Sequence, residues 1–571
     1  MNKYILLVLG ILLVYRPVNA QKLDFNWING VKLAQQDSIT NFLINFNHYP
    51  PSIDFLNTDI FFTGTEHSIS DNDGNLLFYS NGCSLWEHGD TSILISDSLS
   101  AESYSCENGN AFRHPQTLFS LPIGQNKYLI LGASDQLVSN CGIPYYYYLV
   151  IDFSNPPAKI TTEKTILTEG CIRFLSCSRH ANGRDWWVIA AENETKEFRR
   201  WLITPDSMYG PNIQQYDFEF EDGLWWDFTP DGNTMLIRGY KDGYILLLDF
   251  DRCTGLFSNP VKIIMSPYGS FTAVFSPDGR FIYTSDMHFK ELVQFDRMSP
   301  DIAASKKTVA YYDGFIDPKI INAQTLFGSF QRGPNGKIYI YAGDTHYMHV
   351  INFPNRLGDS CNPVLRAITF PQFTFRGYTS YANYRLGPID GSVCDSLGID
   401  NIPMAMYHYD IEDTLSPLAV TFTDASYYEP TSWHWSFGDG NPSTAISPIH
   451  TFAGPGSYTV CLIVSNQYGA DTLCRDIQVD DISNIVNLPI IPQAKISPNP
   501  FNDELHIQLP ALLNGIQSQF RLIDMFGREI LLTTLTDFDN TILVGTIPSG
   551  LYIWQMSWNG KVYQVGKMVK M

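Results

Sequence analysis

Charged residues are scarce in this chain of 571 residues, at 17 %, and acidic residues outnumber basic ones by 58 to 37. The formal net charge of −21 argues against nucleic acid as a partner, because phosphate backbones repel so acidic a surface. The sequence also lacks a phosphate-binding glycine loop and the Gly-x-Ser-x-Gly elbow that presents a nucleophilic serine. After the first apolar stretch, no run is long and apolar enough to span a bilayer.

That first stretch has the features of a secretory signal peptide. Lys3 precedes an apolar run over residues 4–15, and a small-residue Val-Asn-Ala sequence ends just before Gln21. The run is shorter than the roughly 20 residues that a membrane-spanning helix needs. We therefore predict that residues 1–20 are removed on export and that the mature chain has no transmembrane segment.

Aromatic residues are abundant, at 14 %, with 32 tyrosines and 36 phenylalanines. Aromatic and β-branched residues favour strands, and no convincing amphipathic helical pattern interrupts the chain before residue 396. The sequence therefore predicts an all-β protein.

A strand–turn–strand pattern recurs about every 50 residues, which is the size of one four-stranded propeller blade. Each copy has an Asp-Gly or Asn-Gly turn, which accepts the positive φ of a tight hairpin, followed by a strand rich in aromatic residues. A weaker copy covers residues 121–134. The five clear copies place their turn glycines at Gly74, Gly183, Gly232, Gly279 and Gly336.

These repeats predict a β-propeller over residues 21–396, with six or seven blades. A seventh blade would come from Phe370–Gly387, closed by N-terminal residues near 23–33, because closure by both chain ends protects the sheet edges. The Ser-Pro-Asp-Gly turns resemble the blade turns of TolB-like and lactonase-like propellers. That resemblance implies an architecture and no particular reaction.

Few polar residues of the propeller form a recognisable chemical constellation. His346 and His349 are close in sequence, but a metal site needs a further ligand, so we interpret them as polar residues of a loop. In the Trp186-Trp187 and Trp225-Trp226 doublets, strand alternation predicts one buried ring each. We predict no catalytic residue, no metal ligand and no cofactor.

From residue 397 to 481 the pattern changes to short alternating strands with frequent turns, which is typical of a β-sandwich. In the segment 433–440, alternation places Trp433, Trp435 and Phe437 on one core-facing side and His434 on the other. A turn of Gly438, Asp439 and Gly440 ends that strand, and its aspartate is suited to bind backbone N–H groups.

This segment resembles the polycystic kidney disease (PKD) domain, an immunoglobulin-like sandwich. The resemblance rests on Val420–Ser426, on the segment 433–440, on Ser447–Phe452 and on Gly456–Asn466. It implies a binding or spacer module without catalysis. Where the family usually has tyrosine, this chain has Phe452.

Ten cysteines in an exported chain indicate disulfides. Cys461 and Cys474 fall on the outward side of two strands that form a hairpin, so we predict that they are bonded. The other pairings stay open, with Cys83–Cys106 and Cys361–Cys394 as possibilities.

Residues 482–493 form a linker, and residues 494–571 again alternate as a small sandwich. This last region resembles the type A C-terminal sorting domain of the type IX secretion system of Bacteroidetes. The resemblance implies that the secretion machinery is a partner, and that the domain is removed when the protein is released or anchored at the cell surface. The residues that carry it are Pro498, Asn499, Pro500, Gly527, Gly550, Tyr552, Lys567 and Lys570.

Three functions remain compatible with these observations. The first is a binding or adhesion protein whose propeller contacts an extracellular glycan or protein. The second is a propeller-type hydrolase or lyase that acts on extracellular polysaccharide, and the third is a purely structural surface component. A convergent acid, base and cation on one propeller face would favour the enzyme.

Overall fold

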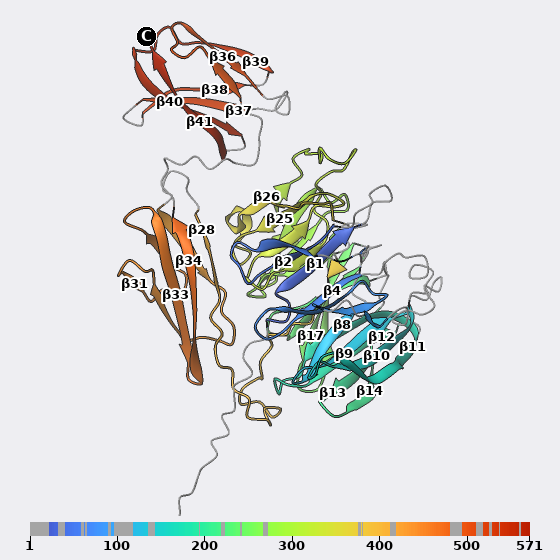
Figure 1. Cartoon of the computed structure of the whole chain (residues 1–571). Coiled ribbons are helices and arrows are strands. Elements are labelled where there is room, and N and C mark those ends of the chain that lie inside the picture. The colour runs from blue at the N-terminus through green and yellow to red at the C-terminus, as the bar shows by residue number, and fades with distance from the viewer. Residues whose placement is uncertain are drawn as a thin grey trace, which may run out of the picture. The chain divides into compact units, whose positions relative to one another are not determined.

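The computed structural model describes residues 22–31, 40–56, 58, 62, 65–89, 93–95, 118–134, 143–192, 195–218, 223–239, 243–265, 272–374, 378–379, 381–411, 418–479, 494–509, 518–524, 528–535, 537–558 and 561–571. These residues form an all-β protein with two short 3-10 turns (Figure 1). Two compact units result, Met1–Val479 and Asp480–Met571. The predicted signal peptide and linker lie outside the described residues.

The first unit begins with a series of antiparallel sheets. The first three blades comprise β1 (Asn26–Val31), β2 (Thr40–Asn45) and β3 (Ser52–Leu56), then β4 (Thr65–Ser70), β5 (Leu76–Ser80), β6 (Leu85–Glu87) and β7 (Ile93–Ile95), then β8 (Phe119–Gly124), β9 (Lys127–Ala133), β10 (Ile143–Asp152) and the first half of β11 (Lys159–Arg179). The next four comprise the second half of β11 with β12 (Trp186–Glu192), β13 (Glu197–Ile203) and β14 (Met208–Gln215), then β15 (Gly223–Phe228), β16 (Thr234–Gly239), β17 (Tyr244–Asp251) and β18 (Leu256–Ile264), then β19 (Ala273–Phe275), β20 (Phe281–Ser285), β21 (Glu291–Asp296) and β22 (Lys307–Tyr311), then β23 (Phe330–Arg332), β24 (Ile338–Tyr341), β25 (Tyr347–Ile351) and β26 (Pro363–Thr369).

Side-chain packing links each of these sheets to the next. Buried clusters join the first sheet to the second, the second through the fifth to one another, the fifth to the sixth and the sixth to the seventh. A further cluster returns from the seventh sheet to the first, through Tyr339 and Met348 against Trp27 and Phe42. The contacts run full circle within the described residues, as in a propeller of seven blades. The third and fourth blades share β11 in one continuous seven-stranded sheet, whereas the seventh meets the first through side chains.

The repeat found in the sequence corresponds to the first turn of the second to seventh blades. All five predicted turn glycines have positive φ, between 72° and 91°. At Gly183 an added Cβ would lie 2.6 Å from Pro388, so both the turn and the close approach require glycine there. The weaker copy is also a blade turn, in which Asn126 takes the positive φ.

The seventh blade differs from the one expected. Residues 26–56 form a sheet of their own, whereas the segment 370–387 contributes only β27 (Tyr378–Thr379), which pairs in parallel with β4. The expectation that this segment would build the blade was wrong, because residues 381–386 of it line the central cavity instead.

The tryptophan doublets are also buried more completely than alternation implied. Trp186, Trp187, Trp225 and Trp226 are all at most 6 % exposed. Both faces of these strands are covered by neighbouring blades, so no ring of either doublet is left at a surface.

A β-sandwich completes the first unit. Its sheets are β28 (Tyr407–Asp410), β29 (Ala419–Asp424) and β32 (Ile449–Thr451), and β31 (Pro442–Ser443), β30 (Ser432–Ser436), β33 (Gly456–Asn466) and β34 (Gly469–Val479). Tyr407, Phe422, Trp435 and Val460 pack between the two sheets.

The second unit is another sandwich. Its sheets are β35 (Lys495–Ser497), β36 (Glu504–Gln508) and β39 (Asp539–Leu543), and β38 (Glu529–Leu535), β37 (Ser518–Asp524), β40 (Gly550–Trp558) and β41 (Lys561–Lys570). The predicted alternation is confirmed, since Leu505, Ile507 and Leu509 are buried and His506 is exposed.

One buried group of the propeller works against stability. Glu66 on β4 is 1 % exposed, and neither carboxylate oxygen has a hydrogen-bond partner within the described residues. Burial raises the pKa of Glu66 well above its ordinary value. The phenols of Tyr341 and Tyr381 are its nearest titratable neighbours of note, and neither supplies a positive charge.

Replacing Glu66 by Gln should therefore stabilise the protein at neutral and alkaline pH. With a folded pKa above the unfolded value of 4.5, wild-type stability is fully present below pH 4.5 and declines as pH rises through the folded pKa. We expect E66Q to melt about 2 °C above wild type at pH 8, and the difference to shrink toward pH 4, as measured by scanning fluorimetry.

Glu192→Gln is the matched control. Glu192 is 2 % exposed, but it accepts a hydrogen bond from the backbone N–H of Thr195 at 2.8 Å and lies 3.9 Å from Arg199. Its replacement should lower the melting temperature. If E66Q melted below wild type at pH 8, the destabilising role of Glu66 would be refuted.

Candidate functional site

The centre of the propeller holds a small polar cavity of about 130 Å³. The inner strands β8, β11, β15, β19 and β23 contribute its walls, together with residues 381–386 of the chain that leaves the last blade. The cavity is therefore the remainder of a channel that this segment has largely filled.

Hydrogen bonds fix the filling segment to several blades. The Tyr384 hydroxyl donates to the carbonyl of Ser120 at 2.8 Å, and the Asn383 amide donates to the carbonyl of Pro230 at 3.0 Å. The Tyr381 hydroxyl lies 2.8 Å from Ser68 Oγ. One chain segment thus contacts three different blades from inside the ring.

Two ion pairs neutralise the carboxylates around the channel. Arg385 binds Asp24 through both terminal nitrogens at 2.5 Å, and both side chains are 8 % exposed. Arg332 binds Asp227 at 2.8 Å, and Asp227 also accepts the backbone N–H of Phe275 at 3.0 Å. Burial raises the pKa of Asp227, although Arg332 beside it acts in the opposite direction.

These four charged residues connect blades, and none was predicted from the sequence. Only Asp227 could have been noticed in the sequence, because it is a charged residue that follows two tryptophans and precedes a phenylalanine in an otherwise apolar inner strand. The carboxylate of Asp227 binds residues of two other blades, Arg332 and Phe275. This structural role accounts for its position and its burial.

The PKD-like sandwich closes the face of the propeller where the first turn of each blade lies. The Tyr427 ring lies under the Arg385 guanidinium, 4.8 Å from its centroid, and its hydroxyl donates to the carbonyl of Pro334 at 2.9 Å. The next two residues, Tyr428 and Glu429, have φ of 64° and 49°, which is rare for residues other than glycine. The loop 424–430 is thus shaped to reach the mouth of the channel.

A buried ion pair fastens the same junction. Lys337 of the propeller and Asp410 of the sandwich lie 2.7 Å apart, with side chains 7 % and 17 % exposed. His408 Nδ1 lies 2.9 Å from the carbonyl of Asn335, and burial near Lys337 lowers the pKa of His408 to about 3. His408 is therefore neutral. The buried Lys337–Asp410 ion pair is the kind of contact expected at a permanent interface between domains.

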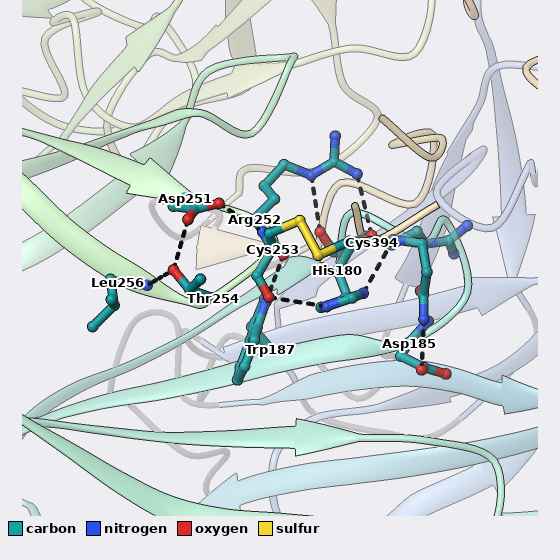
Figure 2. The surroundings of a disulfide bond; sticks show 11 residues. His180, Asp185, Trp187, Asp251, Arg252, Cys253, Thr254, Leu256 and Cys394 are labelled. Carbon is teal, nitrogen blue, oxygen red and sulfur yellow. Dashed lines mark hydrogen bonds between the residues drawn. A yellow bond between two sulfur atoms is a disulfide. The ribbon is translucent and has the colours of Figure 1, made fainter. Parts of the chain in front are cut away.

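A disulfide adds a covalent fastening (Figure 2). Cys253, in the turn after β17, is bonded to Cys394, in the segment that leads from the channel to the sandwich. Arg252 next to it donates to the carbonyls of Arg179 and Gly387. The possible Cys361–Cys394 pairing is therefore wrong, because Cys361 is a buried free thiol.

The two histidines that are close in sequence, His346 and His349, bind different partners. His346 Nδ1 lies 2.7 Å from Asp317, whose carboxylate also accepts the backbone N–H of His346 at 2.8 Å. His349 lies in β25 rather than in a loop, and burial lowers its pKa to about 4. The loop interpretation was wrong for His349, because β25 includes it.

The aromatic motif of the sandwich is a core element. Trp435 and Phe437 are at most 1 % exposed, Trp433 is partly buried, and His434 is exposed. Asp439 binds the backbone N–H of Asn441 at 3.0 Å and His450 Nε2 at 2.8 Å. Gly438 and Gly440 both have positive φ, and at Gly438 an added Cβ would lie 2.8 Å from the carbonyl of Thr459.

Cys461 and Cys474 are directly opposite in the β33–β34 ladder and are joined by a disulfide. Cys83 is also disulfide-bonded, whereas Cys106, its possible partner, lies outside the described residues.

Several residues of the C-terminal motif tie the start of that unit to its last strand. The Asn499 side chain, between Pro498 and Pro500, donates to the carbonyl of Lys567 at 3.1 Å and accepts the N–H of Val569 at 2.9 Å. Lys570 is buried, donates to the carbonyl of Asn502 and lies 5.8 Å from the ring of Phe501. Gly550 begins β40, Tyr552 is 5 % exposed, Lys567 is exposed, and Gly527 lies outside the described residues.

Comparison with known families identifies both sandwiches. Residues 403–480 match the PKD domain, and residues 495–571 match the secretion system C-terminal sorting domain. No curated protein matches the chain. The sorting domain marks the protein for export to the cell surface or for secretion, and it implies contact with the type IX machinery. No helix in the described part of the chain has the length and apolarity needed to cross a membrane.

Solved structures show similarity to both parts of the first unit. The PKD1 domain of the Vibrio cholerae metalloprotease PrtV is 30 % identical over 14 % of this chain and 98 % of its own, with a TM-score of 0.13. The PKD1 domain of Vibrio anguillarum Epp is 28 % identical over 14 % of this chain and 93 % of its own, also with a TM-score of 0.13. The Pseudomonas aeruginosa periplasmic gluconolactonase PpgL is 13 % identical over 62 % of this chain and 99 % of its own, with a TM-score of 0.36.

Breaking the Lys337–Asp410 pair should loosen the junction. Asp410→Ala leaves a buried ammonium without its partner, so we expect a loss of about 3 kcal/mol from the free energy of unfolding of the first unit. Scanning calorimetry of the full chain should show the sandwich and propeller melting in separate steps, where the wild type melts them together.

Arg280→Gln is the control for this change. Arg280 pairs with Asp296 at 2.7 Å but is half exposed, and both residues belong to one blade. Its replacement should leave the calorimetric profile nearly unchanged. A wild-type protein in which the PKD sandwich already melts separately from the propeller would contradict a permanent junction.

Proposed function

We propose that this exported protein with a PKD domain and a sorting domain is a binding protein, whose propeller contacts an extracellular glycan or protein. The observation that carries the proposal is the occupied channel. Residues 381–386 fill it from inside, and the PKD loop that contains Tyr427 covers one of its mouths.

The same observation weighs against a hydrolase or lyase in the channel. Such an enzyme needs a general acid and a base that reach the bond to be cleaved. Asp24 and Asp227 are each held by an arginine, and Asp227 also accepts a backbone N–H. Carboxylates held in this way serve the structure of the ring, which leaves the outer surfaces of the propeller for recognition.

A glycan and protein array tests the proposal directly. We expect the purified mature chain to bind one or more members with unchanged chemistry, because recognition by surface contacts leaves the ligand intact. Binding is scored by fluorescence, and the supernatant over every glycan spot is analysed for cleavage products by mass spectrometry. Product release from any member would refute the non-enzymatic function.

The sorting role is tested by truncation in the native host. A chain that ends at Gln493 lacks the sorting domain and should accumulate in the periplasm, because the machinery has no signal to engage. The surface or secreted fraction is measured by immunoblot against the full chain. Normal surface display of the truncated chain would contradict the assignment.

A further inference from the structure

A second and larger cavity lies where the PKD domain meets the propeller, with a volume of about 570 Å³. That volume is within the range of about 300–1,000 Å³ typical of ligand sites, which often lie between domains. Both domains belong to one compact unit, and the Lys337–Asp410 pair and the Cys253–Cys394 disulfide hold them together. We call this space the seam cavity.

The propeller side of the seam cavity presents two equivalent carboxylates from the sequence repeat. Asp231 and Asp278 occupy the same position in two blade turns, and both line the cavity. In each, Oδ1 accepts a hydroxyl and a backbone N–H of its own turn, whereas Oδ2 has no hydrogen bond within the described residues. The turn therefore fixes each carboxylate and leaves one oxygen available.

Three further carboxylates line the cavity. Asp390 accepts the amide of Asn401 and Asp424 accepts the hydroxyl of Ser426, whereas Glu429 lies on the strained loop already described. Glu429 lines the cavity, is exposed and makes no hydrogen bond or ion pair with a described residue. Its backbone and that of Tyr428 are both left-handed, a costly conformation that is concentrated at ligand-contacting loops.

Carboxylates outnumber arginines in the lining of the seam cavity, by five to three. Arg252 donates to the backbone carbonyls of Arg179, His180, Asp231 and Gly387. Arg385 is paired with Asp24, and Arg356, which is exposed, lies over the ring of Phe353 at 4.0 Å. The lining therefore carries an excess of negative charge, and a complementary ligand has to donate hydrogen bonds and carry positive charge.

We propose that the seam cavity binds a basic peptide segment, through the ammonium or guanidinium group of a lysine or arginine side chain. A basic peptide fits better than a neutral sugar, because sugar hydroxyls carry no charge to complement a lining in which carboxylates outnumber arginines. The net charge of −21 favours the approach of a basic partner. This inference rests on the proposed binding function and specifies the chemistry of one ligand.

The test measures binding of labelled lysine-rich and arginine-rich hexapeptides to the mature full-length chain by fluorescence anisotropy. Neutral and acidic hexapeptides and glucosamine oligosaccharides are the comparison probes. We expect only the basic peptides to bind, and their binding to weaken as salt is raised, because the contacts are between charges near the surface.

The decisive variant is the double substitution Asp231→Asn and Asp278→Asn. Asparagine keeps an oxygen for the turn N–H group and removes the charge, so the blade turns are retained. We expect the Kd for a basic peptide to rise at least about 10-fold in the double variant. Asp71→Asn is the matched control, since Asp71 caps the turn of another blade and does not line the seam cavity.

The outcomes separate this inference from the proposed function. Basic-peptide binding that is lost in the double variant and kept in Asp71→Asn, with melting temperatures unchanged, supports the seam cavity. Equal binding by the double variant, binding of glucosamine oligosaccharides alone, or no peptide binding up to millimolar concentration overturns it. Equal peptide binding by the double variant, with an array ligand that still binds, would leave the proposed function standing and refute the seam cavity alone.

Discussion

The ion pair between Arg385 and Asp24 joins the two ends of the propeller and is the interaction on which the first unit depends. Asp24 precedes the first strand, and Arg385 belongs to the segment that runs through the channel after the last blade. Both side chains are only 8 % exposed, and their pairing holds that segment inside the ring, where Tyr384 and Asn383 bind other blades. The blades also meet through side-chain packing and through Asp227, so the central segment adds to the polar contacts that the ring already has.

The position of the PKD domain follows from the same segment. After leaving the channel, the chain crosses the turn face of the propeller, where the Cys253–Cys394 disulfide fastens it. The PKD domain that follows inserts Tyr427 beneath Arg385, so the ion pair is sealed from outside as well. In this protein the PKD domain is an integral part of the propeller's closure, and the seam cavity exists only because the two domains are fixed together.

Local patterns in the sequence were sufficient for much of the fold. The turn glycines such as Gly232 and Gly279 mark the first hairpin of each blade, because a tight turn needs positive φ whatever surrounds it. Leu505, Ile507 and Leu509 alternate because a half-buried strand has a period of two. The segment 433–440 identified the PKD domain for the same reason, since Trp435 and Phe437 form its core.

Contacts between distant segments could not be obtained in this way. The sequence by itself determined the strand pattern, the turns and the C-terminal sorting domain, because each depends on residues that are neighbours along the chain. The tertiary structure alone decided that both rings of each tryptophan doublet are buried, that Cys394 pairs with Cys253 at a separation of 141 residues, and that residues 381–386 fill the channel. These outcomes depend on which sheets cover one another and on where the chain crosses the ring, and no local periodicity encodes either.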